Sequence, residues 1–150
     1  MEILVKNNTK KRTPETIQAK IQTILNALDC HDSELSVVFV DNDEITDINF
    51  SFRGKNKPTN VLSFPMHEGE FGDLNPELLG DVVISLETAQ DEANKAHIKF
   101  EERLSQLLIH GILHLLGYDH ERSEEDANIM EKKSVEILRL VEKNINLDFF

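Results

Sequence analysis

The sequence contains a single cysteine, Cys30, and it lacks tryptophan altogether. One cysteine cannot form an intramolecular disulfide, so the fold depends on no disulfide framework. No apolar run approaches the roughly eighteen residues of a membrane helix, and the first residues lack the apolar segment of a secretory signal. These absences predict a cytoplasmic protein with no membrane partner.

The length and the composition predict one domain that spans residues 1–150. Hydrophobic residues make up 39% of the chain and charged residues 29%, which is typical of a folded domain. A chain of this length buries roughly 68–70% of its unfolded surface and needs no structural metal to fold. A metal site in it is therefore expected to be functional.

Acidic side chains outnumber basic ones, and the formal net charge is −12. That balance argues against a nucleic-acid partner, because phosphate binding depends on clustered lysine and arginine. The basic residues, however, are concentrated in two windows, 1–20 and 53–57, which together hold eight basic and two acidic side chains. The pattern predicts a small positive face on an acidic body.

The hydrophobic pattern predicts strands over 3–5, 35–40, 60–64 and 81–86, and helices starting at Thr13-Pro14, at Asp41, after residue 86, near Leu104 and at Ser123. In the second helix Ile45, Ile48 and Phe52 share one face. Residues 53–81 are irregular apart from the strand over 60–64, and a long loop in a small domain is often functional. Because strands and helices do not alternate strictly, we expect an α+β fold with a mixed sheet of about four strands and about five helices.

Three histidines have the spacing of metal ligands. His110 and His114 are four residues apart on one helix face, and Gly117 can end the helix and return His120 toward them. Three imidazoles leave one position open on a tetrahedral ion such as zinc, although nickel, copper or iron would also accept them. Buried core histidines and a structural zinc site remain alternatives, and Cys30 is expected to be a small buried side chain rather than a fourth ligand.

The same spacing occurs in zinc proteases, where the residue after the first histidine is a glutamate that serves as general base. Here that residue is Gly111. Attack on a peptide would require another base, for which Asp119 and Glu121 are the candidates. The sequence therefore disfavours a protease-like metallohydrolase without excluding it.

Two long motifs and a shorter one occur along the chain. They are His110-Gly111-x-Leu113-His114-Leu115-x-Gly117-Tyr118-Asp119-His120, Arg53-Gly54-Lys55-Asn56-Lys57-Pro58-Thr59-Asn60-Val61-Leu62-Ser63-Phe64-Pro65, and Gly80-Asp81-Val82-x-Ile84. In these motifs, and in length and element order over essentially the whole chain, the sequence resembles the bacterial YbeY family. Members of that family are metal-dependent endoribonucleases of ribosomal-RNA maturation.

The resemblance implies a single zincin-like domain whose central helix carries the ligands of one zinc ion, His110, His114 and His120. It implies single-stranded RNA as substrate, a role in maturing the 3′ end of the small-subunit rRNA and in ribosome quality control, and the small ribosomal subunit and assembly factors as partners. Arg53 and His114 are then the predicted catalytic residues. A ribosome-assembly factor with a structural metal is the alternative from another class.

Arg53, Lys55 and Lys57 are the predicted substrate-binding residues. The planar guanidinium of Arg53 can donate two hydrogen bonds to one phosphate, whereas the lysines would position the RNA backbone without reading bases. Four aromatic residues have the chemistry to stack on RNA bases, but such residues at the ends of strands and helices belong more often to the core. They are Phe52, Phe64, Phe71 and Tyr118, and none is assigned a base-binding role from the sequence.

Overall fold

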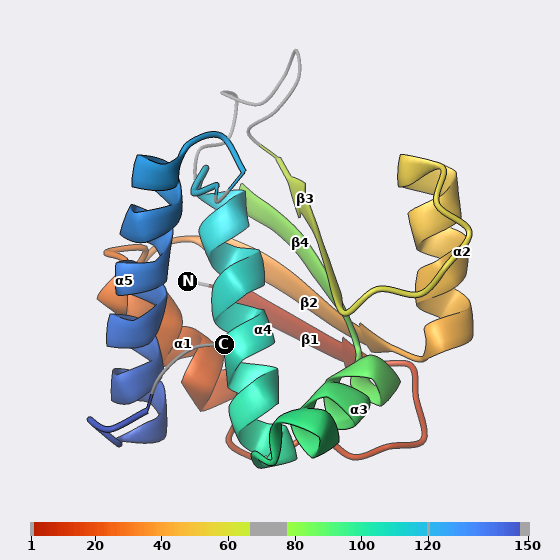
Figure 1. The fold of residues 1–150 in the computed structure, drawn as a ribbon, viewed down its shortest axis with the longest axis horizontal. Helices are drawn as coiled ribbons and strands as arrows, with labels where there is room; N and C mark the ends of the chain where they lie inside the picture. Colours follow the sequence, from red (N-terminus) through yellow and green to blue (C-terminus); the bar gives the residue numbers. More distant parts are fainter. Residues whose placement is uncertain (1, 67–77, 120, 148–150) are drawn as a thin grey trace.

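The computed structural model describes residues 2–66, 78–119 and 121–147. The elements are β1 (Glu2–Asn7), α1 (Ile17–Ala27), β2 (Glu34–Val40), α2 (Asn42–Arg53), β3 (Val61–Pro65), β4 (Leu78–Ser85), α3 (Leu86–Ala96), α4 (Phe100–Leu115) and α5 (Glu124–Glu142). Their order is the predicted one, and over the described residues the α+β fold with a four-stranded mixed sheet and five helices is confirmed (Figure 1).

The sheet has the strand order β1-β2-β4-β3. The strands β1 and β4 both run parallel to β2, while β3 runs antiparallel to β4. Among the described strands, β3 therefore forms one edge of the sheet. A close approach fixes its pairing with β4, because a Cβ at Gly80, whose φ is +134°, would meet the backbone of Phe64.

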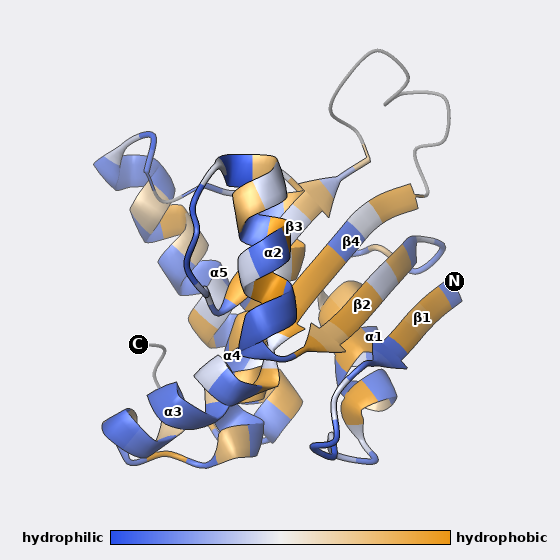
Figure 2. Cartoon of the chain, turned by 90° about the vertical axis from the view of Figure 1, so that its right-hand side faces the viewer, coloured by the Kyte–Doolittle hydropathy of each residue, from blue (hydrophilic) through white to orange (hydrophobic). Residues whose placement is uncertain are grey.

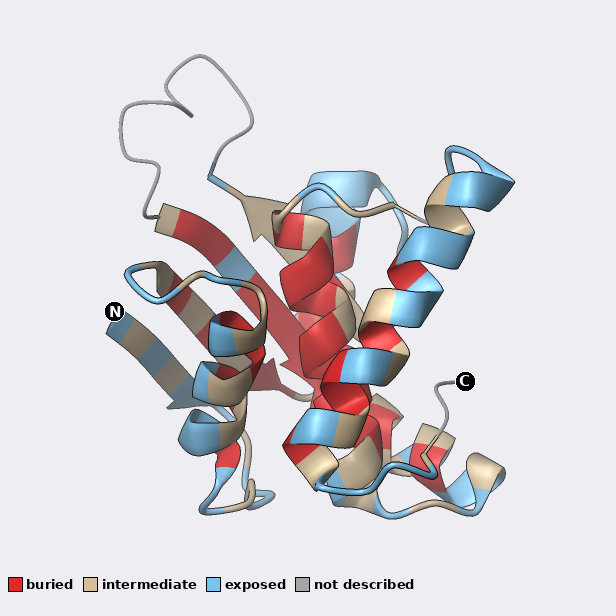
Figure 3. Cartoon of the chain, turned by 90° about the vertical axis from the view of Figure 1, so that its left-hand side faces the viewer, coloured by how far each residue is buried: buried red, intermediate tan, exposed pale blue. Residues whose placement is uncertain are grey.

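Helices cover the two faces of the sheet unequally. Helices α1, α4 and α5 lie on one face, and α2 lies on the other, beside β3 and β4 (Figures 1 and 2). Most residues of α4 are buried between the sheet and the neighbouring helices (Figure 3). A smaller apolar cluster lies between α2 and the sheet and consists of Val40, Ile45, Leu62 and Val83. None of the helices described is long and apolar enough to cross a membrane.

Local hydrogen bonds explain where several helices begin. The side chain of Asp41 accepts a hydrogen bond from the Glu44 backbone N–H, and that of Ser123 accepts one from Asp126, as the capping patterns predict. The predicted start of the first helix at Thr13-Pro14 is wrong, because α1 begins at Ile17 after Thr16. The strand predicted over 81–86 is also displaced. It ends at Ser85, whose hydroxyl accepts the Thr88 N–H and starts α3.

The apolar face predicted for α2 is only partly buried. Ile45 is fully buried and Ile48 is partly buried, but the side chain of Phe52 is 70% exposed. The Phe52 ring contacts β3 through the edge-type contact with Phe64, with centroids 5.1 Å apart. Helical periodicity identified the face correctly, but it could not indicate that the last turn of α2 extends beyond the packed core.

Candidate active site

Two of the predicted metal ligands meet on α4. The Nε2 atoms of His110 and His114 are 3.0 Å apart, and their rings lie at 72° with centroids separated by 4.5 Å. Both side chains are partly buried near the end of the helix. The third predicted ligand, His120, lies outside the described residues. Within residues 2–66, 78–119 and 121–147, no group of three potential ligands is close enough to hold an ion.

The chemistry of this pair fits a zinc ion. Zinc–nitrogen bonds are about 2.0–2.1 Å long, so one ion can reach two nitrogens that lie 3.0 Å apart. At the end of α4, Gly117 has a φ of +94° and turns the chain back toward the histidines. The residues that follow this turn, Asp119 and Glu121, line the same cavity as His110 and His114.

The cavity has a volume of about 390 Å³ and lies between α4 and the edge strand β3. Its described lining combines charged, polar and apolar side chains: Arg53, Val61, Leu62, Ser63, Pro65, His110, His114, Asp119 and Glu121. The structure thus places Arg53 in one cavity with His110 and His114. The predicted substrate-binding residues Lys55 and Lys57 are exposed and do not contribute to this lining.

The position of Arg53 follows from how α2 ends. Gly54 has a φ of +71°, and its N–H donates to the carbonyl of Phe50, so the chain leaves the helix directly after Arg53. The connection to β3 is then anchored by Asn49, which is 1% exposed and donates from Nδ2 to the Lys57 carbonyl at 2.9 Å. Asn49 was not predictable from the sequence, because an asparagine in a helix gives no signal of a contact with a later loop.

Gly111 explains why a glutamate is absent after the first histidine. A Cβ at this position would lie 2.7 Å from Cγ1 of Val82, and β3 atoms of Val61 and Ser63 would lie 3.2 and 3.3 Å away. The position therefore faces the sheet and has no space for a side chain. A general base must come from another position, and the carboxylates of Asp119 and Glu121 are the described acidic groups in the cavity. Gly111 thus excludes a zinc-protease glutamate at this position, while the two cavity carboxylates are the bases that the protease-like alternative would require.

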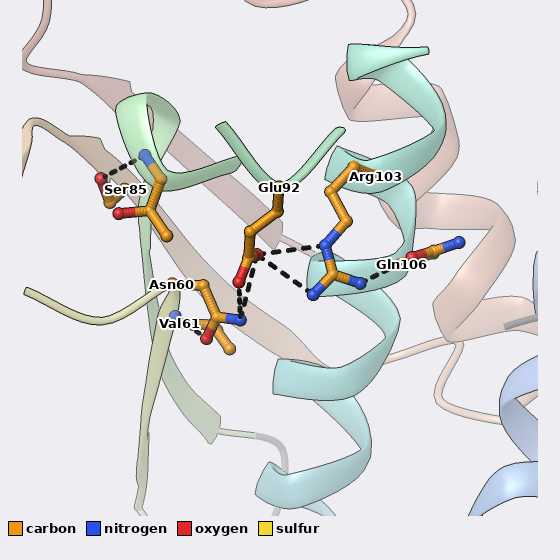
Figure 4. A network of polar contacts seen from close by, with 7 residues as sticks. Asn60, Val61, Ser85, Glu92, Arg103 and Gln106 are labelled. Carbon is orange, nitrogen blue, oxygen red and sulfur yellow. Dashed lines mark hydrogen bonds and ion pairs between the residues drawn. The ribbon is translucent and has the colours of Figure 1, made fainter. Parts of the chain in front are cut away.

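A polar network that the sequence analysis did not identify positions β3 against α3 and α4 (Figure 4). Asn60 donates to both carboxylate oxygens of Glu92 at 3.2 Å, and its Oδ1 accepts the N–H of Val61. Arg103 contacts the same carboxylate at 3.1 Å and donates to Gln106 at 2.6 Å. The network therefore connects the first residue of the β3 wall to the helix that carries the histidines.

The two basic windows of the sequence do not form one positive face. Lys11 lies 4.6 Å from the ring centroid of Phe100, the first residue of α4, whereas Arg53 shares the cavity with His110 and His114 at the other end of that helix. A rise of 1.5 Å per residue separates the two ends by roughly 20 Å. The sequence left open whether the two windows meet, and the structure places Lys11 and Arg53 at opposite ends of α4. Cys30 is half-buried, packs against the main core and is not part of the cavity lining.

The fold and the cavity define a class of α+β protein in which a central helix and an edge strand enclose paired histidines and an arginine. The family described as endoribonuclease YbeY matches residues 3–142. The chain belongs to this family.

The sequences of individual relatives align with nearly the whole chain. The chain is 50% identical over 145 residues to the endoribonuclease YbeY of Geobacter sulfurreducens, covering 95% of this chain and 97% of the relative. It is 42% identical to that of Syntrophus aciditrophicus, with coverages of 94% and 90%. A solution structure from Thermotoga maritima is similar, with a TM-score of 0.69, 30% identity and coverages of 94% and 89%.

Proposed function

We propose that this protein is a zinc-dependent endoribonuclease that cleaves single-stranded RNA. The observation that carries the proposal is the cavity in which Arg53 lies with His110 and His114, whose Nε2 atoms converge to 3.0 Å. Membership of the endoribonuclease YbeY family supports the substrate class.

Each group in the cavity has a role that its chemistry allows. His110 and His114, with His120, would hold the metal, and a bound zinc ion supplies Lewis acidity that polarises a phosphoryl oxygen. Arg53 would bind the phosphate through its planar guanidinium group and neutralise the charge that develops at phosphorus. Asp119 and Glu121, which line the cavity, would accept a proton, and Lys55 and Lys57 would contact the RNA backbone outside the cavity.

The cellular role that we propose is maturation of the 3′ end of small-subunit rRNA and ribosome quality control in the cytoplasm. The small ribosomal subunit and its assembly factors are the proposed partners. The charge distribution supports this proposal, because an acidic chain with few cations at its cavity gains little long-range electrostatic attraction for RNA. Its specificity would then come from a docking partner.

The experiment is cleavage of a labelled single-stranded RNA by protein purified without an affinity tag. Cleavage should disappear after chelation and return when zinc is added, while circular dichroism shows that the fold persists. Stoichiometric metal without metal-dependent cleavage would favour an assembly factor with a structural metal. Cleavage of a peptide but not of RNA would favour the protease-like hydrolase.

A further inference from the structure

Two aromatic rings meet beside the cavity, on the opposite face of β3. The rings of Phe52 and Phe64 are in edge contact, with centroids 5.1 Å apart at 61°. Phe64 follows Ser63 and precedes Pro65, both of which line the cavity, and Phe52 immediately precedes Arg53. Because side chains alternate along a strand, Val61 and Ser63 face α4, while Leu62 and Phe64 pack on the α2 side.

The surroundings of Phe52 leave most of its side chain in solvent. Phe64 is partly buried against the apolar cluster between α2 and the sheet, so it can hold the Phe52 ring in place. Phe52 itself remains 70% exposed. An exposed aromatic ring that is fixed by a second ring offers a planar apolar surface at low cost in side-chain entropy.

The charge of this part of the chain suits a polyanion. Residues 48–66 contain three cationic side chains, Arg53, Lys55 and Lys57, and no carboxylate, although the whole chain has a net charge of −12 and the exposed Asp81 of β4 pairs with Phe64. Proteins that bind single-stranded nucleic acids combine cations along the backbone with aromatic rings on which bases stack. Both features are present here, because Phe52 precedes Arg53 in the sequence and Lys55 and Lys57 follow it.

We propose that Phe52, supported by Phe64, is the stacking platform for one base of the RNA, next to the nucleotide whose phosphate Arg53 binds. The RNA strand would pass from the cavity round the edge of the sheet that β3 forms. This inference rests on the proposed function, because it assigns a base-binding subsite to the same RNA cleft. It adds a contact that tolerates any base, since every base offers a π-face.

The absence of tryptophan allows a direct test. In the F52W variant the introduced indole is the sole tryptophan, and stacking of a base should quench its fluorescence. The matched control is F50W. Phe50 is also exposed, at 57%, but it lies two residues earlier on α2 and therefore about 200° round the helix. The titrant is oligoadenylate, checked on a gel to be intact throughout. We expect saturable quenching in F52W and none in F50W.

Binding by the protein with its metal provides the second readout. F52A should raise the Kd for oligoadenylate about tenfold, within the range measured for loss of one stacked base. F52L, which keeps an apolar side chain against Phe64 but lacks the ring, should show the same loss, whereas F50A should bind like the parent. An abasic site at the stacked position should weaken binding by the parent but not by F52A. Circular dichroism and urea denaturation verify that each variant is folded.

The outcomes separate this inference from the proposed function. If the parent cleaves RNA but F52A and F52L bind and cleave it normally, the platform is wrong and the endoribonuclease proposal stands. If the parent cleaves no RNA yet F52W is quenched and F52A loses affinity, the platform stands and the catalytic proposal fails. Equal quenching of F52W and F50W would also overturn the platform, because it would show that the RNA contacts this part of α2 without stacking specifically at position 52.

Discussion

Ser63 donates a hydrogen bond of 2.9 Å from its Oγ to the carbonyl oxygen of Gly111. The bond joins the edge strand β3 to α4 at the residue that follows the first histidine. The two walls of the candidate active site are thus fixed to each other inside the site itself. Their separation depends on the small size of Gly111.

Gly111→Ala should destabilise the protein by about 1–2 kcal/mol. The new Cβ would lie 2.7 Å from Cγ1 of Val82, and overpacking of this kind outweighs the gain of roughly 1 kcal/mol in helix propensity. The measurement is urea denaturation. Val82→Ala removes the obstructing atom, so the double variant should be about 1 kcal/mol more stable than the two single effects predict. Strictly additive effects would contradict close packing at this position.

Arg53→Ala should retain the full metal content and lose cleavage activity by roughly 100-fold, as expected when a group that stabilises transition-state charge is removed. Arg53 lines the cavity but is not a metal ligand in this account. The matched control is Lys95→Ala, which removes an exposed cation of α3 that does not line the cavity and should have a small effect. Kinetics and elemental analysis on the same samples give both quantities. Equal losses in the two variants would remove Arg53 from the mechanism.

Glu92→Ala should lower the free energy of unfolding by about 2–3 kcal/mol. The change would leave Arg103, which is 8% exposed, without the carboxylate that lies 3.1 Å from it, and it would also release Asn60. Glu101→Ala is the control, because Glu101 is exposed at the start of α4. Chemical denaturation of both variants tests the prediction. Equal stability would show that the network does not stabilise the fold.

Sequence reasoning succeeded where the signal was local. The capping patterns at Asp41 and Ser123, and the helical spacing of His110 and His114, all act within four residues. It failed where residues distant in sequence meet. The contact of Asn60 with Glu92 spans 32 positions, and no local sequence pattern at either residue indicates its partner. The exposure of Phe52 was missed for a related reason, because periodicity does not reveal where a packed surface ends.

Glu102 should make stability depend on pH. Burial raises the pKa of its carboxyl above the usual value, and the nearby Glu142 raises it further while Lys99 lowers it. Because the folded pKa is raised, the folded protein is favoured below the ordinary glutamate pKa of about 4.3, and this stability is lost as the pH rises through the folded value.

Glu102→Gln removes the charge and should therefore stabilise the protein at pH 7. We expect the free energy of unfolding to increase by roughly a few tenths of a kcal/mol, since the side chain of Glu102 is partly exposed. The gain should vanish near pH 4, where the parent carboxyl is protonated. Urea denaturation from pH 4 to 8 measures it, with Glu101→Gln as the control. A gain that is independent of pH would contradict the assigned cause.

The central claim is that His110, His114 and His120 hold a metal on which RNA cleavage depends. The most direct measurement is the metal content of untagged parent protein and of His114→Ala, combined with RNA cleavage by both, with His31→Ala as an exposed-histidine control. The account predicts about one metal ion per chain and cleavage in the parent and in His31→Ala, and neither in His114→Ala. Full metal occupancy in His114→Ala, or undiminished cleavage by the metal-free parent, would contradict it.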